Sequence, residues 1–414
     1  MIKNKIDFEK LNKIVKTNKE PVAIVLGSYI TTGLGAIRNL GRKGIKTILL
    51  DSKSRQICFC SRYCVGFSCP DLKKSEIEYI NFLKYVGENL PNKGVLFPTS
   101  DIELVTILKF RRDLEPFFDF PMADFDIVNK MIDKRSFYRQ LEKCNITHPT
   151  TYFPENIQDL SSIGGEIKYP CIVKPSFSEE FHKDFNLKVF TAKTKEELIK
   201  WYELGQKKNH KMMIQEIIPG NADCMYGFNA YYNKKFRPMG CFTYRRIREW
   251  PHTFGNGCFI ESVVKPELEE IINLFIKNIR YYGIVDAEFK IDPRNGAINL
   301  IEINPRLWMQ NSLPARCGAN HAFIAYSDIT GKPIKNGFTR EDNVKWLYMF
   351  EDLFSSQKNI SNKRLFIIQW LKSFRGKKEY CIFAWDDPLP FILFWTVLFF
   401  SAYKYIKLNS RYKN

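Results

Sequence analysis

Glu302, Asn304 and Arg306 can bind metal ions or phosphate, and they follow one another at steps of two in INLIEINPRLW, residues 298–308. Side chains two positions apart on a strand point to the same face, so this apolar strand is predicted to present a carboxylate, an amide and a guanidinium together. A carboxylate buried without a partner is costly, and such a group normally has one. The stretch therefore predicts a binding partner for Glu302.

A second strand with the same alternation precedes it. In VDAEFKID, residues 285–292, charged side chains alternate with apolar ones. If the turn DPRNG pairs the two strands, Glu288 and Glu302 meet on one face. Two carboxylates and an amide oxygen suit Mg²⁺ or Mn²⁺, and Mg²⁺ sites with few carboxylates usually complete their shell with substrate phosphates. A metal–nucleotide complex is the predicted partner. The alternative is a solvated charge ladder in which Glu302 pairs with Lys290 or Arg306.

The N-terminal part of the chain predicts alternating strands and helices. Residues 22–51, VAIVLGSYITTGLGAIRNLGRKGIKTILLD, are expected to form strand, turn, helix and strand, and residues 94–114 repeat the pattern. Continuous apolar strands are typical of buried parallel sheets, so residues 1 to about 125 are predicted to form a small, doubly wound α/β domain. The glycines of this segment also suggest an alternative function, that of a nicotinamide-dependent dehydrogenase. However, GSYITTGLG does not match the dinucleotide-binding motif GxGxxG.

The middle of the chain combines helices with mostly antiparallel strands. A helix is expected from about Asp133 to Lys143, and YPCIVKPS, residues 169–176, contains an apolar strand that ends on Lys174. KMMIQEIIPG, residues 211–220, is a strand closed by Pro-Gly. The segments GFNAYYN, RPMGCFTY, IVDAEFKID and AINLIEIN complete an α+β region.

This order of elements resembles the ATP-grasp superfamily. A lysine opens a helix (Lys134), a lysine ends a strand (Lys174), and IQEIIPG, DAEFKID and IEINPRLW follow. The resemblance is closest to the predicted carboxylate–amine ligases of that superfamily, related to its carbamoyl-phosphate synthase and D-amino-acid ligase branches. It covers about residues 20–335, and EINPRLW…ANHAFIAYSDITGK is its most specific part.

The resemblance implies the organisation of most of the chain. Residues 1–125 would form a Rossmann-like domain. Residues 126–335 would form the two α+β lobes of an ATP-grasp fold, with a hinge near residues 215–219. After about residue 335 the composition becomes aromatic and basic, so residues 336–414 are predicted to form a hydrophobic, basic and aromatic helical tail. ATP-grasp enzymes hold ATP between the two lobes, activate a carboxylate as an acyl phosphate and let a nucleophile, usually an amine, attack it.

The resemblance also assigns the nucleotide contacts by position. Lys134 and Lys174 match the two lysines that contact the ATP phosphates, and an ammonium at a strand end is a suitable point charge for that contact. The segment QEII matches the hinge against adenine. The remaining ATP-binding candidates are Gln215, Glu216, the backbone at Ile218 and, for the ribose, Asp223.

The acidic strands receive their roles in the same way. Glu288, Glu302 and Asn304 match the ligands of Mg²⁺, or of Mn²⁺ in its place. Arg306 matches the arginine that steadies the transferring phosphoryl group, which suits a planar guanidinium. Arg306 and Lys174 are the predicted catalytic residues.

Two segments leave alternatives open. Many ATP-grasp enzymes close a glycine-rich loop over the phosphates, but residues 176–188, SFSEEFHKDFNLK, contain no glycine. His182 or Lys183 are candidates to replace its backbone donors. In YRRIREWPHTFGNG, Arg246 or Arg248 are candidates to reach phosphate or the carboxylate substrate, and a solvated basic edge is the alternative.

The composition is that of a globular protein. The chain is 45% hydrophobic and 26% charged, and its eleven cysteines show no regular framework. The polar N-terminus does not resemble a signal peptide, so the reducing cytoplasm is the expected location. The net charge is +18, but no basic run interleaved with stacking aromatics indicates a nucleic-acid platform. Nucleic acid is therefore not an expected partner.

The basic excess is concentrated near the C-terminus, where residues 356–414 hold eleven Lys or Arg against three acids. The apolar run from Leu389 to Tyr403 would span roughly 22 Å as a helix, which is short of the hydrocarbon core of about 30 Å. Its aromatic and basic residues favour an anionic membrane surface, so residues 388–414 are predicted to hold the protein peripherally on the inner face of the membrane. A helix docked on the ligase body or in a homodimer interface is the alternative.

The predicted function is ATP-dependent ligation of a small-molecule carboxylate to an amine through an acyl phosphate, with release of ADP and phosphate. The alternatives are a non-catalytic nucleotide-binding module at a membrane surface and the dehydrogenase. The intact set of Glu288, Glu302, Asn304 and Arg306 argues against the first alternative.

Overall fold

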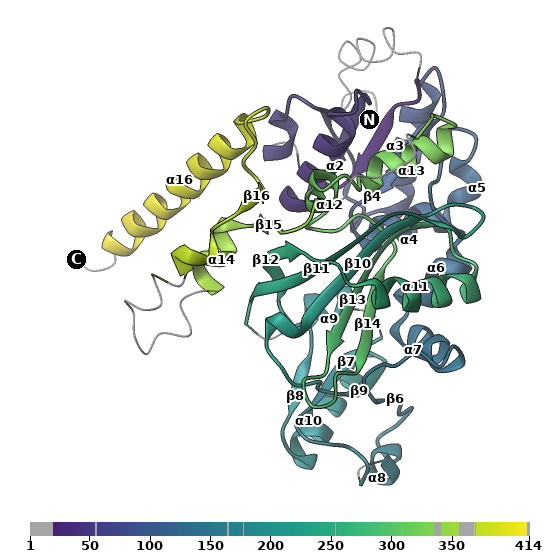
Figure 1. Cartoon of the computed structure of the whole chain (residues 1–414), viewed down its shortest axis with the longest axis vertical. Helices are drawn as coiled ribbons and strands as arrows, with labels where there is room; N and C mark the ends of the chain where they lie inside the picture. The colour runs from purple at the N-terminus through teal and green to yellow at the C-terminus, as the bar shows by residue number, and fades with distance from the viewer. Residues whose placement is uncertain are drawn as a thin grey trace. The chain divides into compact units, whose positions relative to one another are not determined.

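The computed structural model describes residues 20–53, 56–163, 165–176, 178–252, 254–334, 341–355, 368 and 370–411 (Figure 1). These residues form two compact units. The N-terminal unit contains the described residues within Met1–Pro121, Arg306–Met349 and Lys377–Asn414, and the central unit those within Met122–Pro305 and Phe350–Gly376. The predicted domain boundaries near residues 125 and 335 stay a prediction.

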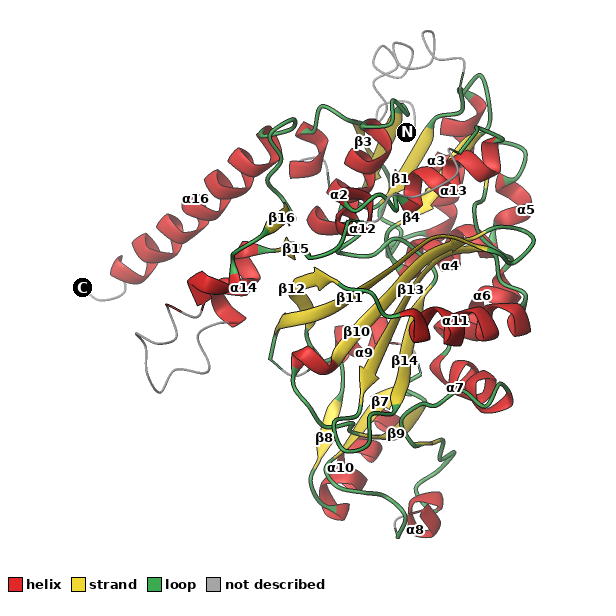
Figure 2. Ribbon diagram, viewed as in Figure 1, coloured by secondary structure: helices red, strands yellow, loops and turns green. Residues whose placement is uncertain are grey.

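A five-stranded parallel sheet lies at the centre of the N-terminal unit, in the order β3-β2-β1-β4-β5 (Figure 2, strands in yellow). Every residue of β1 is buried, as expected of a strand covered on both faces. The predicted alternation of strands and helices is confirmed. The elements are β1 (Ala23–Leu26), α2 (Ile30–Gly41), β2 (Thr47–Asp51), η2 (Ile57–Cys60), β3 (Val65–Ser68), α3 (Glu76–Glu88), β4 (Gly94–Pro98), α4 (Asp101–Lys109), α5 (Arg111–Leu114) and β5 (Phe118–Asp119).

The C-terminal part of the chain is not wholly helical, and in this respect the predicted helical tail is wrong. Short strands β15 (Val344–Leu347) and β16 (Lys377–Tyr380) pair in parallel within the N-terminal unit. Four residues are too few to show a recognisable alternation of apolar and polar side chains. These segments therefore form strands because they pair and because Trp346 is buried, and their local sequence pattern does not predict them. The same unit contains α12 (Ser312–Arg316), α13 (His321–Thr330) and α16 (Leu389–Arg411).

A buried ion pair fastens the segment that leads into α16. The Arg38 guanidinium on α2 contacts the Asp387 carboxylate at 2.9 Å, and their side chains are 3% and 2% exposed. The Ser61 hydroxyl and the Arg62 backbone N–H also donate to Asp387, at 2.7 and 3.0 Å. The start of α16 is therefore tied to α2 and to the loop after η2.

The central unit contains two antiparallel sheets. The larger, with α11 (Pro266–Ile279) and α14 (Met349–Ser355), is called the large lobe below. Its strands within the central unit follow the order β14-β13-β10-β11-β12. They are β10 (Met225–Tyr232), β11 (Pro238–Trp250), β12 (Asn256–Ser262), β13 (Gly283–Ile291) and β14 (Ile298–Asn304), with η3 (Ala222–Cys224) just before β10.

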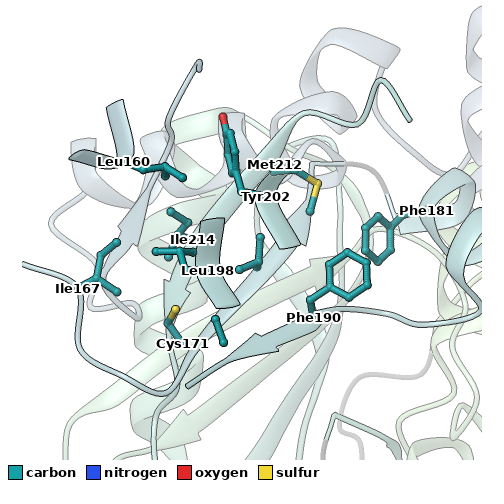
Figure 3. Packing of buried hydrophobic residues seen from close by; sticks show 11 residues of the cluster. Leu160, Ile167, Cys171, Phe181, Phe190, Leu198, Tyr202, Met212 and Ile214 are labelled. Carbon is teal, nitrogen blue, oxygen red and sulfur yellow. The ribbon is translucent and has the colours of Figure 1, made fainter. Parts of the chain in front are cut away.

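The second sheet, called the small lobe with its helices, has the strand order β6-β9-β7-β8. Buried residues of its strands and of α10, among them Leu198, Tyr202, Met212 and Ile214, form its core (Figure 3). Its elements are β6 (Thr151–Tyr152), α8 (Asp159–Ile163), β7 (Cys171–Pro175), α9 (Ser178–Phe185), β8 (Phe190–Ala192), α10 (Lys195–Lys207) and β9 (Met212–Glu216). The helices α6 (Phe125–Ile132) and α7 (Lys134–Lys143) precede these elements and contact β14 and α11 of the large lobe.

Candidate active site

The two strands predicted to carry a metal site pair as expected. β13 and β14 are antiparallel, and Glu288 lies directly opposite Glu302 in their register. Asp286 lies opposite Asn304 in the same way. One face of the large lobe therefore brings together the three predicted metal ligands.

Asp286 controls the orientation of Asn304. The Asn304 amide nitrogen donates to one carboxylate oxygen of Asp286 at 3.1 Å, and the Asn229 amide nitrogen on β10 donates to the other at 2.8 Å. Asp286 is 3% exposed. The three residues thus link β14, β13 and β10, and the bond fixes which end of the Asn304 amide faces Asp286.

Arg246 is the cation that accompanies Glu288. Its guanidinium contacts the Glu288 carboxylate at 2.6 Å, and its side chain is only 6% exposed. The alternative of a solvated basic edge is therefore wrong for Arg246. Gly227 lies between Glu288 and Tyr244 in the ladder of β13, β10 and β11, and a Cβ at Gly227 would lie 2.1 Å from the Tyr244 ring. Because Gly227 has no side chain, the Tyr244 ring of β11 can lie over β10 at this position.

The donor set fits a small divalent cation. Burial raises the pKa of Glu288, the nearby Arg246 opposes this rise, and the facing Glu302 adds to it. A divalent cation would relieve that repulsion. Within the part of the chain that the structure describes, no three His, Cys, Asp or Glu side chains gather as a metal site. The protein would thus supply two carboxylates and one amide, and phosphate and water the remaining ligands, as is usual for Mg²⁺.

Lys174, near the end of β7, is a buried ammonium with hydrogen-bond partners. Its Nζ donates to the Gln215 Oε1 at 2.7 Å and to the Tyr138 hydroxyl at 3.4 Å. Burial lowers the pKa of Lys174 to about 7, Lys134 lowers it further, and Glu302 raises it. Lys134 opens α7, as predicted. The charges of Lys134 and Glu302 therefore both influence the Lys174 ammonium, which brings the two predicted phosphate lysines and one predicted metal ligand into the same part of the central unit.

The predicted hinge residues differ in their surroundings. Gln215 is 2% exposed and Ile218 is 5% exposed, whereas Asp223 in η3 is exposed. The Glu216 carboxylate accepts hydrogen bonds from Arg294 at 2.9 Å and from the Thr150 hydroxyl at 3.1 Å. Glu216 thereby joins the small lobe to the turn between β13 and β14, and the adenine and ribose contacts stay predictions.

Arg306 lies outside the strand that carries the acidic residues. β14 ends at Asn304, and the proline that follows cannot donate to a ladder, so the prediction that Arg306 shares the strand face is wrong. Arg306 belongs to the N-terminal unit. There its guanidinium contacts the carboxylate of Asp101, the first residue of α4, at 2.6 and 3.4 Å. Its catalytic role stays a prediction.

The glycine-free segment after Lys174 contains a helix, α9, rather than an extended loop. Phe181 on α9 is fully buried in the core of the small lobe, while His182 and Lys183 are exposed. Farther along, the Lys188 Nζ donates to Asn256 at 3.0 Å, and its charge lowers the pKa of Glu288. The roles of His182 and Lys183 stay predictions, and Lys188 is a further cation near the acidic strands.

Several residues around the site were not found from the sequence. Asp286 stands two positions before Glu288, so the alternation of β13 contained a signal for it. Tyr138 and Arg294 had none, because a tyrosine on the apolar face of α7 and an arginine in a turn match ordinary structural patterns. Their contacts connect segments far apart in the sequence, which local patterns do not encode.

Comparison with known proteins agrees with this geometry. No protein-family model matches the chain. It is 23% identical over 366 residues to the D-aspartate ligase of Enterococcus faecium (strain Aus0004), which covers 83% of this chain and 85% of that protein. It is 22% identical over 210 residues to the carbamoyl phosphate synthase large chain of Buchnera aphidicola subsp. Acyrthosiphon pisum (strain APS), covering 47% of this chain and only 18% of that protein.

Solved structures show the same fold. A biotin carboxylase–β,γ-ATP complex from Campylobacter jejuni matches with a TM-score of 0.62 and 16% identity, over 79% of this chain and 74% of that one. An L-amino acid ligase from Bacillus licheniformis matches with a TM-score of 0.57 and 14% identity, over 77% and 75%. The findings favour the ligase over both the dehydrogenase and the non-catalytic module. The chain therefore has the fold of the ATP-grasp enzymes and is similar to ATP-dependent carboxylate–amine ligases with that fold.

Proposed function

We propose that the central unit forms an acyl phosphate from ATP and a small-molecule carboxylate, and then an amide or peptide-like bond with an amine. The observation that carries the proposal is the register that brings Glu288 opposite Glu302, with Asn304 two residues farther along β14. A carboxylate oxygen attacks the γ-phosphorus, and the bond from that phosphorus to ADP breaks. The amine nitrogen then attacks the acyl carbon, and phosphate leaves.

Residues of α7 and of the small lobe bind and orient the nucleotide in this proposal. Lys174 and Lys134 are point charges for the phosphate oxygens, Gln215 holds the Lys174 ammonium, and the segment through Ile218 contacts the base. The support is the buried hydrogen bond from Lys174 to Gln215 and the electrostatic influence of Lys134 on Lys174. Such fixed charges accelerate phosphoryl transfer mainly by positioning and by stabilising developing charge.

Glu288, Glu302 and Asn304 would hold Mg²⁺ or Mn²⁺, and a bound ion would neutralise charge on the phosphate oxygens. Arg246 favours the charged form of Glu288 by direct contact, and Asp286 holds the Asn304 amide. In the N-terminal unit, which would be a Rossmann-like domain, Arg306 would steady the transferring phosphoryl group. Its fixed bond to Asp101 supports an oriented guanidinium.

We also propose that at least one of the two substrates is an amino acid. The support is the similarity to a D-aspartate ligase over most of both chains and the fold shared with an L-amino acid ligase. The test measures ADP and phosphate release from the full chain with MgCl₂, ATP and a panel of D- and L-amino acids and uronic acids. Hydroxylamine should trap the acyl phosphate as a hydroxamate when the correct acid is present. Release of AMP and pyrophosphate would refute this mechanism.

A second proposal concerns α16, which would bind an anionic membrane surface. Within the described residues, no helix combines the length and the apolar character needed to cross a membrane, so the contact would be peripheral. Trp385, just before the helix, is 88% exposed, and Ile392 and Phe399 are 54% and 70% exposed. The sequence adds Lys404 and Lys407 to the same helix. An apolar segment next to basic residues provides the two signals that stable peripheral binding usually needs.

A further inference from the structure

We propose that Tyr138 is a positioning residue that couples the phosphate lysine Lys174 to the metal-binding end of β14. The inference rests on the proposed function, because it gives Tyr138 a role in presenting Lys174 and Glu302 to the phosphates of ATP. Tyr138 lies on α7, which contacts α11 of the large lobe, and is fully buried.

The first observation is a bulge in β14 beside Glu302. Glu288 pairs with Glu302, whereas the next residue of β13, Phe289, pairs with Leu300. Ile301 is thus the extra residue of a β-bulge, and its backbone is removed from the regular ladder. The Tyr138 hydroxyl donates a hydrogen bond to the Ile301 carbonyl at 2.7 Å. A side chain of α7 therefore satisfies the irregular backbone next to a predicted metal ligand.

The second observation is that the same hydroxyl accepts a hydrogen bond from Lys174. The distance from the Lys174 Nζ to the Tyr138 oxygen is 3.4 Å, and the ammonium lies 5.2 Å from the centre of the tyrosine ring. One buried hydroxyl thus contacts the ammonium predicted to bind phosphate and the strand predicted to bind the metal.

The network continues on the far side of Lys174. The Lys174 Nζ donates to the Gln215 Oε1 at 2.7 Å, the Gln215 Nε2 donates to the Thr151 hydroxyl at 2.8 Å, and this hydroxyl donates to the Pro149 carbonyl at 2.7 Å. Lys174 is therefore held from two sides, by Gln215 of its own lobe and by Tyr138. Only the Tyr138 arm reaches β14 directly.

The chemistry of the hydroxyl suits this role. Burial raises the pKa of Tyr138, the hydrogen bond with Gln215 lowers it, and the nearby Glu302 raises it. The hydroxyl therefore keeps its proton and donates it to the Ile301 carbonyl while its lone pairs face Lys174. A phenylalanine would fill the same space but would remove both hydrogen bonds, leaving a buried carbonyl without this donor.

The test compares two full-length variants that each lose one buried tyrosine hydroxyl. Tyr138→Phe removes the proposed coupling. Tyr202→Phe is the matched control, because its hydroxyl lies in the small lobe, donates to the Pro154 carbonyl at 2.9 Å and accepts from the Gln206 Nε2 at 3.3 Å. Binding of AMP-PNP is titrated at several MgCl₂ concentrations, and binding of adenosine is measured separately, since adenosine has no phosphates.

We expect Tyr138→Phe to bind AMP-PNP about tenfold more weakly, or worse, and to need more MgCl₂, because residues that orient metal and phosphate ligands typically contribute 10–100-fold. Adenosine binding should not change, and Tyr202→Phe should match the unmodified protein in both assays. Equal AMP-PNP binding by the two variants, or an equal loss of adenosine binding in Tyr138→Phe, would overturn the inference.

Two further outcomes are distinguishable. If the unmodified protein does not bind AMP-PNP, the proposed function fails first. If Tyr138→Phe does not fold, Tyr138→Met is measured in its place, with the same expected loss. Loss of the fold in both variants would overturn the inference, because the tyrosine would then serve the core rather than the site.

Discussion

Glu288 and Glu302 lie directly opposite each other where β13 and β14 pair. Like charges in such cross-strand pairs destabilise a sheet, and here burial further raises the pKa of Glu288. The pair persists beside Arg246, whose guanidinium contacts Glu288 at 2.6 Å. A stability cost of this kind is expected where a sheet is built to bind a cation and phosphate.

Glu302→Gln should lose ATP turnover while keeping the fold, because an amide cannot supply the negative charge that a divalent cation needs. We expect ADP release to fall at least about 100-fold, the scale seen when a preorganised charge-stabilising group is removed. ADP release and thermal unfolding are measured together. The control is Glu261→Gln, which removes a strand carboxylate paired with Arg245 at 2.6 Å. Unchanged turnover in folded Glu302→Gln would exclude the metal assignment.

Arg246→Ala should destabilise the protein, because it leaves the Glu288 carboxylate, which faces Glu302, without the guanidinium that contacts it. Breaking a buried ion pair on one side typically costs about 3–5 kcal/mol, and the partial exposure of Glu288 places the expected value near the lower end. Added MgCl₂ should recover part of the loss if the carboxylates bind the ion. Thermal unfolding with and without MgCl₂ measures both effects. A variant insensitive to MgCl₂ would contradict the site.

Affinity for ATP should decrease as the pH rises through about 7, because burial lowers the pKa of Lys174 to about 7 and only its ammonium form attracts phosphate. Lys134 and Glu302 are the charged groups that act on it. AMP-PNP titrations between about pH 6 and 9 measure the effect. Lys174→Met should bind weakly and with little dependence on pH over the same range. An equal pH dependence in both proteins would assign the titration to another group.

The stability effect of Lys174 has the opposite direction. The unfolded chain keeps this proton up to a pKa near 10.5, whereas the folded protein releases it at about 7. Between these values the unfolded state binds more protons, so the contribution of Lys174 to stability increases with pH and is least favourable below about 7. Lys174→Met should remove this part of the pH dependence, as measured by urea unfolding at several pH values.

Asp387→Ala should destabilise the N-terminal unit far more than Asp386→Ala. Asp387 is buried against Arg38, whereas the Asp386 side chain is 41% exposed in its pair with Arg42. Removing one partner of a buried pair typically costs about 3–5 kcal/mol, and an exposed pair contributes about 0–1 kcal/mol. Thermal unfolding of the two neighbouring variants provides the comparison. If the two variants lost equal stability, the burial of the Arg38–Asp387 pair would not explain how the segment before α16 is held.

Replacing Ile392 and Phe399 together by serine should release the protein from anionic vesicles, because both apolar side chains are largely exposed on α16. The control is Thr396→Ser, at an exposed position of the same helix that already carries a hydroxyl. Sedimentation with phosphatidylserine vesicles measures binding. If the unmodified chain stays in the supernatant like the double variant, α16 serves a protein interface instead.

The sequence by itself determined most of the elements and the pairing of the acidic strands. Apolar runs and alternation depend only on neighbouring residues, so β1, β2, β7, β9 and β13 could be predicted with the helices that separate them. The short turn DPRNG restricts β13 and β14 to few registers, which is why Glu288 and Glu302 could be expected on one face. The order of lysines and acidic strands then indicated the superfamily.

Only the tertiary structure decided what surrounds those residues. The bond from Tyr138 to Ile301 joins residues 163 positions apart, and the contact of Arg246 with Glu288 also joins different strands. The bulge at Ile301 exists only where β13 and β14 pair. β15 and β16 exist because they pair with each other, and Arg306 leaves the strand because Pro305 cannot continue the ladder. Hydrogen bonds and packing between distant segments depend on the folded arrangement, and local residue patterns contain no record of it.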